Sequence, residues 1–373
     1  MTIRVGIIFG GRSGEHEIAI RSARTVFSQI DRNKYSPVPV AITPQGYWLA
    51  PAASAELLGV AKPDSVGSSD ENGEIAGMFG DPRNKGISVI NNGVLMHLPL
   101  DVVFPVLHGT YGEDGTIQGL FEMADIPYVG CGVLASSCGM DKVTMKLLFR
   151  EAGLPICKYT WLLRSEWEKE PRAVLDRIEA ELGYPCFVKP ANLGSSVGVS
   201  GAADREELTE AINDAALYDR KIIIEEAVEM REIECAVLGN DEPIASRPGE
   251  YIIRNKDKAF LDYTEKYSGT GNNEFVVPAP ISDDIEKFVR EMAVTAFKSI
   301  DGSGLARVDF FLRTSDGELL VNEINTMPGL TDASGYPKMW AGSGKPFTEV
   351  INTLIELALE RHKDRARNRT SIN

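Results

Sequence analysis

The sequence predicts an α/β protein built from several domains, and three observations support this prediction. Its 373 residues are enough for two or three domains with substantial cores. In the first third, continuous apolar segments alternate with segments of helical periodicity, as in a parallel sheet covered by helices on both faces. From about Cys157 onward the order of the expected strands and helices changes. We therefore predict an N-terminal Rossmann-like parallel sheet followed by two α+β modules.

The N-terminal third holds three apolar segments that we expect to form strands: IRVGIIF, YSPVPVAIT and LDVVFPVLHG. After the first of them, Ile20, Ala23, Phe27 and Ile30 recur on one face of an expected helix. The segments TIQGLFEMA and DKVTMKLLFREAG predict two further helices. Ser, Gly, Asp and Pro are frequent at about 52–92, which predicts an irregular surface insertion.

Short elements make up the rest of the chain. The expected strands are YTWLL, PCFVKPA, KIIIEEAV, REIECAVLG, ARVDFFLR and ELLVNEIN, and the expected helices are REELTEAINDAALY and DIEKFVREMAVTAFKSI. A polar, turn-rich stretch at about 255–275 is long enough to form a lid or an Ω-loop. The basic end, RHKDRARNRTSIN, predicts a frayed helix terminus.

Charge and cysteine content argue against several classes of function. The net charge of −15 argues against a nucleic-acid or anionic membrane partner. The five cysteines are scattered and form no CxxC pair, which argues against a zinc site or a disulfide framework and favours a reducing compartment. The sequence shows neither a signal peptide nor an apolar run long enough to span a membrane. We therefore expect a cytoplasmic protein of enzyme size.

The sharpest chemical signal lies in the segments RVDFF and VNEIN. If these strands pair as a hairpin, Asp309 can face Glu323, and Asn325 points to the same side as Glu323. Two carboxylates and an amide oxygen suit Mg²⁺ that also binds phosphates, and Arg307 shares their face. A solvated strand face with cross-strand ion pairs explains the same spacing equally well.

A second signal is the segment FVKPANLGSSVGVS, in which an expected strand ends at Lys189 and a loop rich in Gly and Ser follows. Backbone N–H groups of such a loop can cradle an anion, and a strand lysine can bind phosphate. Ser195 and Ser196 add hydroxyl donors. The pattern is not GxxxxGK[ST], so it is no Walker P-loop. An ordinary hairpin turn is the alternative.

Two further segments carry weaker signals. In IIIEEAVEMREIE, Glu225 and Glu226 end an apolar strand where adenine could bind, and Glu232 could bind ribose, although a charge run is usually a solvated face. In HGTYGEDGTIQG, glycines follow a strand at the edge where open α/β sheets bind ligands. His108 at this edge either orients a substrate or bonds to a backbone carbonyl.

Eight segments, taken in order, strongly resemble the D-alanine–D-alanine ligases of the ATP-grasp superfamily. They are GGRSGEHE, HGTYGEDGTIQG, MDKVTMK, VKPANLGSSVG, EEAVEMREIECAVLG, DYTEKY, ARVDFF and NEINTMPGLT. The resemblance extends from Val5 to about Trp340 and implies a three-domain ATP-grasp architecture whose two α+β modules clamp ATP. The implied domains are 1–135, 136–226 and 227–373. The resemblance also implies a homodimer.

The resemblance further implies an ATP site with two Mg²⁺ or Mn²⁺ ions. Lys142 and Lys189 match the lysines on the α- and β-phosphates, and Ser195 and Ser196 lie in the loop over the phosphates. Lys266 matches an ATP-binding group around the γ-phosphate. The implied adenine-side and ribose-side positions are Glu225, Glu226, Ala227, Val228, Glu232 and Phe260. The implied metal ligands are Asp309, Glu323 and Asn325.

The same match implies the substrate site. Glu15 resembles the residue that binds the ammonium group of the first D-alanine, whereas Arg307 and the N–H of Gly329 resemble an oxyanion hole. The opening turn GGRSGEHE, which lacks GxGxxG, therefore reads as part of a substrate site and not as a phosphate cradle. The implied catalytic set is Glu15, Ser195, Tyr267, Arg307, Gly329 and Ser334, and the implied substrate contacts are Glu15, His108, Lys266, Arg307 and Ser334.

The implied reaction is the ATP-dependent joining of two D-alanine molecules through an acyl phosphate, for peptidoglycan precursors. The alternatives are D-lactate or D-serine as the second substrate, and a non-catalytic ATP-grasp regulatory protein. Tyr267 within EKY favours D-alanine over D-lactate. Three positions depart from the family pattern near the substrate subsites: Ala19 stands where Ser is frequent, and Asp332 and Gly335 stand where Ser and a larger apolar residue are usual.

Overall fold

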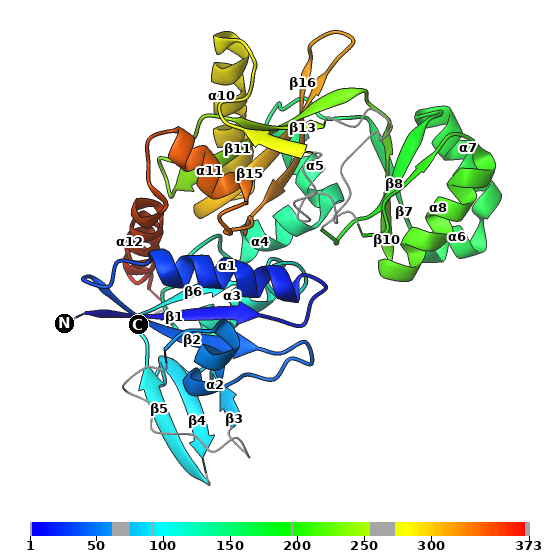
Figure 1. Cartoon of the computed structure of the whole chain (residues 1–373). Coiled ribbons are helices and arrows are strands. Elements are labelled where there is room, and N and C mark those ends of the chain that lie inside the picture. Colours follow the sequence, from blue (N-terminus) through cyan, green and yellow to red (C-terminus); the bar gives the residue numbers. More distant parts are fainter. Residues whose placement is uncertain (1, 62–74, 92, 195–196, 254–272, 370–373) are drawn as a thin grey trace.

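The structure is a computed structural model that describes residues 2–61, 75–91, 93–194, 197–253 and 273–369. Figure 1 shows three regions: an N-terminal sheet with its helices at the bottom, a C-terminal module above it, and a central module to one side. Parallel pairing occurs in the N-terminal sheet and antiparallel pairing in the other sheets, as the sequence predicted. No helix among these residues is long and apolar enough to span a lipid bilayer.

A three-stranded parallel sheet, in the order β2-β1-β6, forms the N-terminal region. Its strands and the neighbouring helices are β1 (Ile3–Gly10), α1 (His16–Gln29), β2 (Tyr35–Ile42), β6 (Val102–Val106) and α3 (Thr116–Met123). Ile7 and Phe9 on β1 pack in one core with α1, whereas Ile8 packs in another core with α3. Burial on both faces explains why these strands are continuously apolar.

The insertion at 52–92 is not irregular where the structure describes it, so that prediction was wrong. Its described part contains most of one helix and the strands β3 and β4, which form a small antiparallel sheet with β5, directly after the segment, in the order β3-β4-β5. The elements are α2 (Pro51–Leu58), β3 (Ile75–Gly77), β4 (Gly86–Asn91) and β5 (Val94–Pro99). Ile87 and Val89, on either side of Ser88, pack in the core that also holds Ile8. Burial of these side chains against the N-terminal sheet stabilises regular strands here, although the composition of the segment is largely polar.

The central module is an antiparallel sheet in the order β7-β10-β8-β9, and Figure 1 shows its helices α6, α7 and α8 on one face. Its elements are β7 (Tyr159–Leu163), α6 (Arg164–Lys169), α7 (Pro171–Glu181), β8 (Cys186–Pro190), β9 (Ser200–Ala202), α8 (Arg205–Tyr218) and β10 (Lys221–Glu226). Ile222 and Ile224 of β10 pack with Leu208 and Ile212 of α8 in a core of their own. Residues on the opposite face of this sheet line the cavity described below.

The C-terminal module is an antiparallel sheet in the order β14-β13-β11-β15-β16, with β12 paired to β11. Its strands are β11 (Met230–Gly239), β12 (Ile244–Ala245), β13 (Gly249–Ile253), β14 (Asn273–Val276), β15 (Gly304–Arg313) and β16 (Leu319–Asn325). Val308 and Phe310 point to the face covered by α5 (Lys142–Glu151) and α10 (Asp283–Ser299). The alternate residues Arg307 and Asp309 therefore point to the other face.

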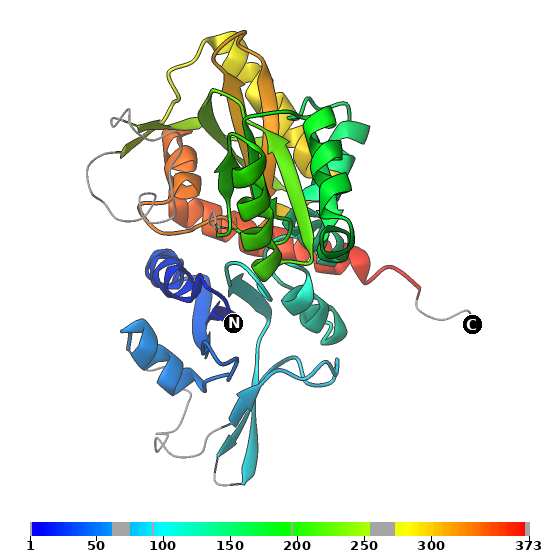
Figure 2. The same ribbon diagram turned by 90° about the vertical axis from the view of Figure 1, so that its right-hand side faces the viewer.

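Three helices connect the regions. They are α4 (Val133–Met140), α11 (Gly335–Gly342) and α12 (Phe347–Arg365). In both views α12 lies between the N-terminal sheet and the C-terminal module, and its apolar residues share one core with both (Figure 2). Helix α12 continues into the basic end and stops at Arg365, and Arg361 within it donates hydrogen bonds to the carbonyls of Gly130 and Tyr128. Fraying beyond that point stays a prediction.

The implied domain borders stay predictions, and two observations bear on them. The border between residues 135 and 136 falls inside α4. Helix α5, assigned by that division to the central module, packs Met145 and Phe149 into the core beneath the C-terminal sheet. The border between residues 226 and 227 coincides with the end of β10.

Candidate functional site

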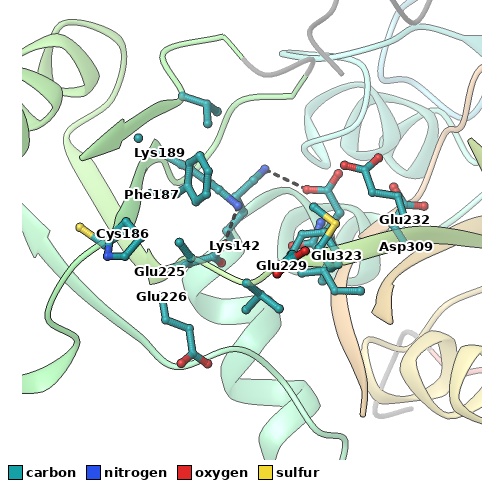
Figure 3. Close-up of a pocket in the computed structure, with 18 of the residues that line it drawn as sticks. Lys142, Cys186, Phe187, Lys189, Glu225, Glu226, Glu229, Glu232, Asp309 and Glu323 are labelled. Carbon is teal, nitrogen blue, oxygen red and sulfur yellow. Dashed lines mark hydrogen bonds and ion pairs between the residues drawn. The ribbon is translucent and has the colours of Figure 1, made fainter. Parts of the chain in front are cut away.

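A cavity of about 820 Å³ lies between the central and C-terminal sheets. Figure 3 shows that its lining comes from both modules: Lys189 and Glu225 on one side, and Asp309 and Glu323 on the other. Segments that are far apart in the sequence therefore meet here. Most of the residues that the sequence associates with a nucleotide or a metal line this one cavity.

Lys189 lies one residue before the end of β8, which pairs with β10, and its Nζ donates a hydrogen bond to Glu225 Oε2 at 2.5 Å. Burial alone would raise the pKa of the Glu225 carboxyl, but Lys146 and Lys189 hold it well below its ordinary value. Burial would lower the pKa of Lys189, but Glu225 raises it above its ordinary value. The carboxylate and the ammonium group are therefore both charged at neutral pH.

Lys142 begins α5 and reaches across to two other segments. Its Nζ donates to the carbonyl of Leu193 at 2.8 Å, in the loop that follows β8, and lies 3.5 Å from Glu323 Oε2. Asp141 caps the helix by accepting a hydrogen bond from the N–H of Thr144, which fixes where the helix begins. Lys142 therefore contacts the loop that follows the strand of Lys189, and both lysines line the cavity. Two ammonium groups in one cavity suit a polyphosphate.

The candidate metal ligands lie in register on adjacent strands. Asp309 of β15 pairs with Glu323 of β16, and Arg307 pairs with Asn325, which confirms the hairpin that the sequence predicted. Arg307 donates to Asp309 Oδ1 at 2.7 Å and to Oδ2 at 2.6 Å, and Asn325 donates to Asp309 Oδ2 at 3.1 Å. Glu234 of β11 flanks Asp309 on its other side. One carboxylate row thus crosses three strands.

The donor chemistry of this row fits a magnesium ion, since carboxylate and amide oxygens are its preferred protein ligands. In the described part of the chain, however, no three His, Cys, Asp or Glu side chains are gathered closely enough to hold a metal ion. Asp309 is engaged by Arg307, and Glu323 lies beside Lys142. An arriving cation would have to replace these contacts.

The register of β16 shifts directly after the Glu323 pair. Phe310 pairs with Val321, so that Asn322 is the extra residue of a β-bulge. Its carbonyl accepts a hydrogen bond from Lys146 Nζ at 3.3 Å. The bulge therefore gives a buried lysine a partner immediately beside a candidate metal ligand.

The nucleotide side of the cavity includes all the described residues that the resemblance assigned to adenine and ribose. Glu225, Glu226, Ala227, Val228 and Glu232 all line it. The N–H of Ala227 donates to the carbonyl of Pro185, and Glu226 accepts from the N–H of Lys158, so both groups have partners inside the protein. Apolar side chains that the sequence analysis did not single out share the lining: Phe187, Val199 and Met230.

Glu15 lies at the start of α1, at the carboxyl edge of the N-terminal sheet. Its Oε2 is 2.7 Å from the place where a Cβ of Gly109 would be, and 3.6 Å from that of Gly194. A side chain at Gly109 would therefore collide with the carboxylate, and the positive φ of 75° at this residue also favours glycine. Because Gly194 precedes Ser195 directly, the carboxylate of Glu15 lies close to both the N-terminal and the central region.

His108 is 3% exposed, and both of its ring nitrogens have protein partners. Nδ1 lies 3.0 Å from the carbonyl oxygen of Met327, and Nε2 lies 3.0 Å from the hydroxyl of Ser22. That hydroxyl also accepts a hydrogen bond from the N–H of Leu330 at 3.2 Å. The pair of His108 and Ser22 therefore fixes the loop on both sides of Gly329, which the resemblance places in the oxyanion hole.

The loop before α11 contains Ser334, which the resemblance assigns to the second substrate. Ser334 is buried, and its hydroxyl lies 2.7 Å from that of Thr331. A Cβ at Gly335 would lie 2.4 Å from Glu234 Oε2, so this position has no room for a side chain without a shift of Glu234. Asp332 is exposed and Ala19 is fully buried in α1. No described contact assigns either of these two residues a role.

Five predicted site residues lie outside the described part of the chain: Ser195, Ser196, Phe260, Lys266 and Tyr267. The predicted lid at 255–275 falls almost entirely outside it as well. Their assignments stay predictions.

The structure adds four polar residues that the sequence analysis missed: Ser22, Glu113, Lys146 and Glu234. Lys146 is 1% exposed and follows Lys142 by four residues, so the two lie on one helix face. Glu234 follows Glu232 by two residues on β11 and so shares its face. Those spacings were readable in the sequence. Ser22 carried no comparable signal, because its partner His108 lies 86 residues away. Glu113 lies in the same loop as its partner His108, but the spacing of the two residues does not predict their contact.

Comparisons with known proteins agree with this geometry. Residues 4–131 match the family model described as the D-ala D-ala ligase N-terminus, and residues 148–356 match the D-ala D-ala ligase C-terminus. A D-alanine–D-alanine ligase of Heliobacterium modesticaldum is 46% identical over 98% of this chain and 97% of its own length. One of Geobacillus thermodenitrificans is 47% identical over 98% of each.

Solved structures give the same result. The VanG D-Ala:D-Ser ligase from Enterococcus faecalis is 36% identical with a TM-score of 0.81, over 96% of this chain and all of that one. The D-alanine–D-alanine ligase from Coxiella burnetii is 35% identical with a TM-score of 0.80, over 98% and 96% of the two chains. On its sequence and on its fold, the chain belongs to the D-alanine–D-alanine ligase family.

Proposed function

We propose that this protein joins two molecules of D-alanine at the expense of ATP, for peptidoglycan precursors. The observation that supports this most directly is the cavity between two sheets, where Lys142 and Lys189 lie beside the paired carboxylates Asp309 and Glu323. Cations for a polyphosphate and oxygen ligands for a divalent ion thus meet in one place.

ATP would lie between the two modules. The apolar lining by Phe187, Val199 and Met230 suits a purine base, and the two lysines lie where the phosphates would follow. Asp309, Glu323 and Asn325 would hold two Mg²⁺ or Mn²⁺ ions. Such ions offset the negative charge of the phosphates during transfer.

The first chemical step makes a carboxylate reactive. Its own leaving group would be oxide, which departs poorly, so one carboxylate oxygen of the first D-alanine attacks the γ-phosphorus of ATP and releases ADP. The resulting acyl phosphate carries phosphate as its leaving group. Arg307, on the same face as Asp309, would stabilise the charge that develops on the transferred group.

The second step forms the amide bond. The amine of the second D-alanine attacks the acyl carbon, the amine loses a proton, and inorganic phosphate leaves. Arg307 and the N–H of Gly329 would stabilise the tetrahedral oxyanion, while His108 and Ser22 keep the Gly329 loop in place. Glu15 would hold the ammonium group of the first substrate, and Ser334 would bind the carboxylate of the second.

A coupled assay tests this proposal. Phosphate release is measured with ATP, Mg²⁺ and either D-alanine, D-serine, D-lactate or no acceptor. We expect turnover that depends on D-alanine and a product identified by mass spectrometry as the dipeptide. Turnover equally fast with D-lactate at neutral pH would instead assign a depsipeptide ligase, and no D-alanine-dependent turnover would disprove the proposal.

We also infer that the protein acts in the cytoplasm as a homodimer. The cysteines Cys131, Cys138, Cys157, Cys186 and Cys235 are all unpaired, as expected for a reducing compartment. The homodimer rests on the family resemblance. Sedimentation equilibrium at micromolar concentration would test it directly.

A further inference from the structure

Three charged side chains form a buried cluster beside the cavity: Lys146 of α5, Lys189 of β8 and Glu225 of β10. Glu225 Oε1 lies 2.9 Å from Lys146 Nζ, and Oε2 lies 2.5 Å from Lys189 Nζ. Lys146 is 1% exposed and Glu225 is 3% exposed, so solvent hardly screens these charges. The cluster holds two cations and one anion.

The partners of Lys146 are all acceptors. Besides Glu225, its Nζ contacts the carbonyl oxygen of Asn322 at 3.3 Å, at the bulge of β16. An ammonium group, which donates only, suits both contacts. Lys146 does not line the cavity, whereas Lys189 and Glu225 do. Lys146 is therefore part of the cluster without access to a ligand.

The side chains that line the cavity are mostly acidic, so the positive charge of Lys189 matters for binding an anion. The described lining contains eight Asp and Glu side chains but only two lysines. One of these lysines, Lys142, already lies 3.5 Å from Glu323. The other, Lys189, forms an ion pair with Glu225. A polyphosphate would meet a strongly acidic wall if Glu225 neutralised Lys189 completely.

We infer that Lys146 is a positioning residue for nucleotide binding. Its charge balances Glu225, so that the charge of Lys189 stays available to the phosphates of a nucleotide that Lys146 never touches. This inference rests on the proposed function, because it assumes that the cavity binds ATP. It assigns the buried lysine an electrostatic role and not merely a structural one.

The test separates phosphate binding from base binding in the full-length protein. Isothermal titration gives the dissociation constants of ADP and of adenosine without added metal, and their ratio measures what the phosphates contribute. In Lys146→Met we expect ADP to bind at least tenfold more weakly, about 1.4 kcal/mol, and adenosine to bind unchanged. Lys146→Arg should keep the original ratio.

A matched control is Arg150→Met. Arg150 lies on the same helix and is exposed, so its loss changes the net charge equally but leaves the cluster intact. This variant should keep the original ratio. Lys146→Gln serves if the methionine variant is poorly folded, because it carries no charge but keeps an amide N–H donor in the buried site, and it should lower ADP affinity in the same way.

The double variant Lys146→Met with Glu225→Gln is the most decisive arm. It removes one cation and one anion, so the charge of Lys189 is again available, and the ratio of the two dissociation constants should recover. Equal weakening of ADP and adenosine in Lys146→Met, or a ratio that does not recover in the double variant, would overturn the inference. If the unaltered protein binds neither ligand, the proposed ATP site itself is wrong.

Discussion

Asp309 on β15 lies directly opposite Glu323 on β16, and the register of the two strands shifts immediately afterwards. The backbone pairing holds these two carboxylates on one face, together with Arg307 and Asn325 two pairs further along. Because strand pairing sets the arrangement, changing one side chain should alter the chemistry of the site and leave the fold in place.

We expect Glu323→Gln to lower D-alanine-dependent phosphate release at least about 100-fold, since even the partners of metal ligands commonly account for about 10- to 100-fold. Mn²⁺ binding, followed by electron paramagnetic resonance, should weaken in parallel. The far-UV circular dichroism spectrum should not change. Glu318→Gln is the control, because Glu318 is exposed beside β16 and pairs with Arg313 on the surface. Near-normal turnover of the Glu323 variant would show that the metal assignment is wrong.

The pairing of Asp309 with Glu323 could be predicted because it depends on a local rule. Side chains two apart on a strand share a face, and two adjacent strands with a short connection pair as a hairpin. A second local pattern predicted the parallel N-terminal sheet: its strands are continuously apolar and alternate with helices. The hairpin of β4 and β5 also had a local signal, Asn-Gly between two apolar segments, which the polar composition of the region obscured.

The contacts of Lys146 and His108 could not be predicted in this way. Lys146 meets a carbonyl 176 residues away, and His108 meets one 219 residues away. Both contacts depend on how separate sheets pack together, and no periodicity in the sequence records that packing. A buried lysine in an apolar helix signals that some partner exists, but not which one.

The stability of the protein should fall as pH rises above neutrality because of His108. Burial would lower the pKa of this histidine, but its hydrogen bond to Glu113 and the charges of Glu113 and Glu15 raise it above its ordinary value of 6.5. A raised pKa in the folded state contributes stability that is complete below about pH 6.5 and is lost as pH rises through the folded value. Burial and the charge of Glu15 also raise the pKa of Glu113, which acts in the same direction.

Urea unfolding at about pH 6 and about pH 8.5 measures this effect. The unaltered protein should lose more unfolding free energy between the two values than His108→Gln, whose side chain does not titrate. An equal loss in both proteins would show that other groups control the pH dependence. Ser22 and the carbonyl of Met327, the other partners of His108, carry no charge and leave the sign unchanged.

Gly335→Ala should disturb the second-substrate side of the site. Its Cβ would lie 2.4 Å from Glu234 Oε2 and 2.9 Å from the ring of Phe275, and both belong to neighbouring strands. Overpacking of this kind typically costs about 1–3 kcal/mol of unfolding free energy. We expect that loss in urea unfolding, together with a higher KM for D-alanine.

Gly119→Ala is the control, because a Cβ at Gly119 of α3 meets nothing within 4 Å. That variant should be more stable by about 0.5–1 kcal/mol, and similar behaviour of the two variants would contradict the steric argument.

Arg361 of α12 links the N-terminal region to the C-terminal module. Its guanidinium donates to the carbonyls of Gly130 and Tyr128 and to the hydroxyl of Ser303, and it lies 4.4 Å from the centre of the Tyr128 ring. Arg361→Met keeps the apolar stem but removes every one of these donors. One hydrogen bond to a charged group contributes about 1.5–3 kcal/mol. The three bonds share one guanidinium, so their contributions do not simply add, and we expect the unfolding free energy to fall by about 2–4 kcal/mol.

The control for Arg361 is Lys363→Met, two residues further along the same helix, where the side chain is exposed. It removes one positive charge without removing a contact between the regions, so its unfolding free energy should change by less than about 0.5 kcal/mol. Limited proteolysis adds a second measurement, because weaker docking of α12 should expose the chain around Gly130 in Arg361→Met alone. If both variants unfold at the same urea concentration, the hydrogen bonds of Arg361 do not hold the two regions together, and the apolar core shared by α1 and α12 must supply that stability instead.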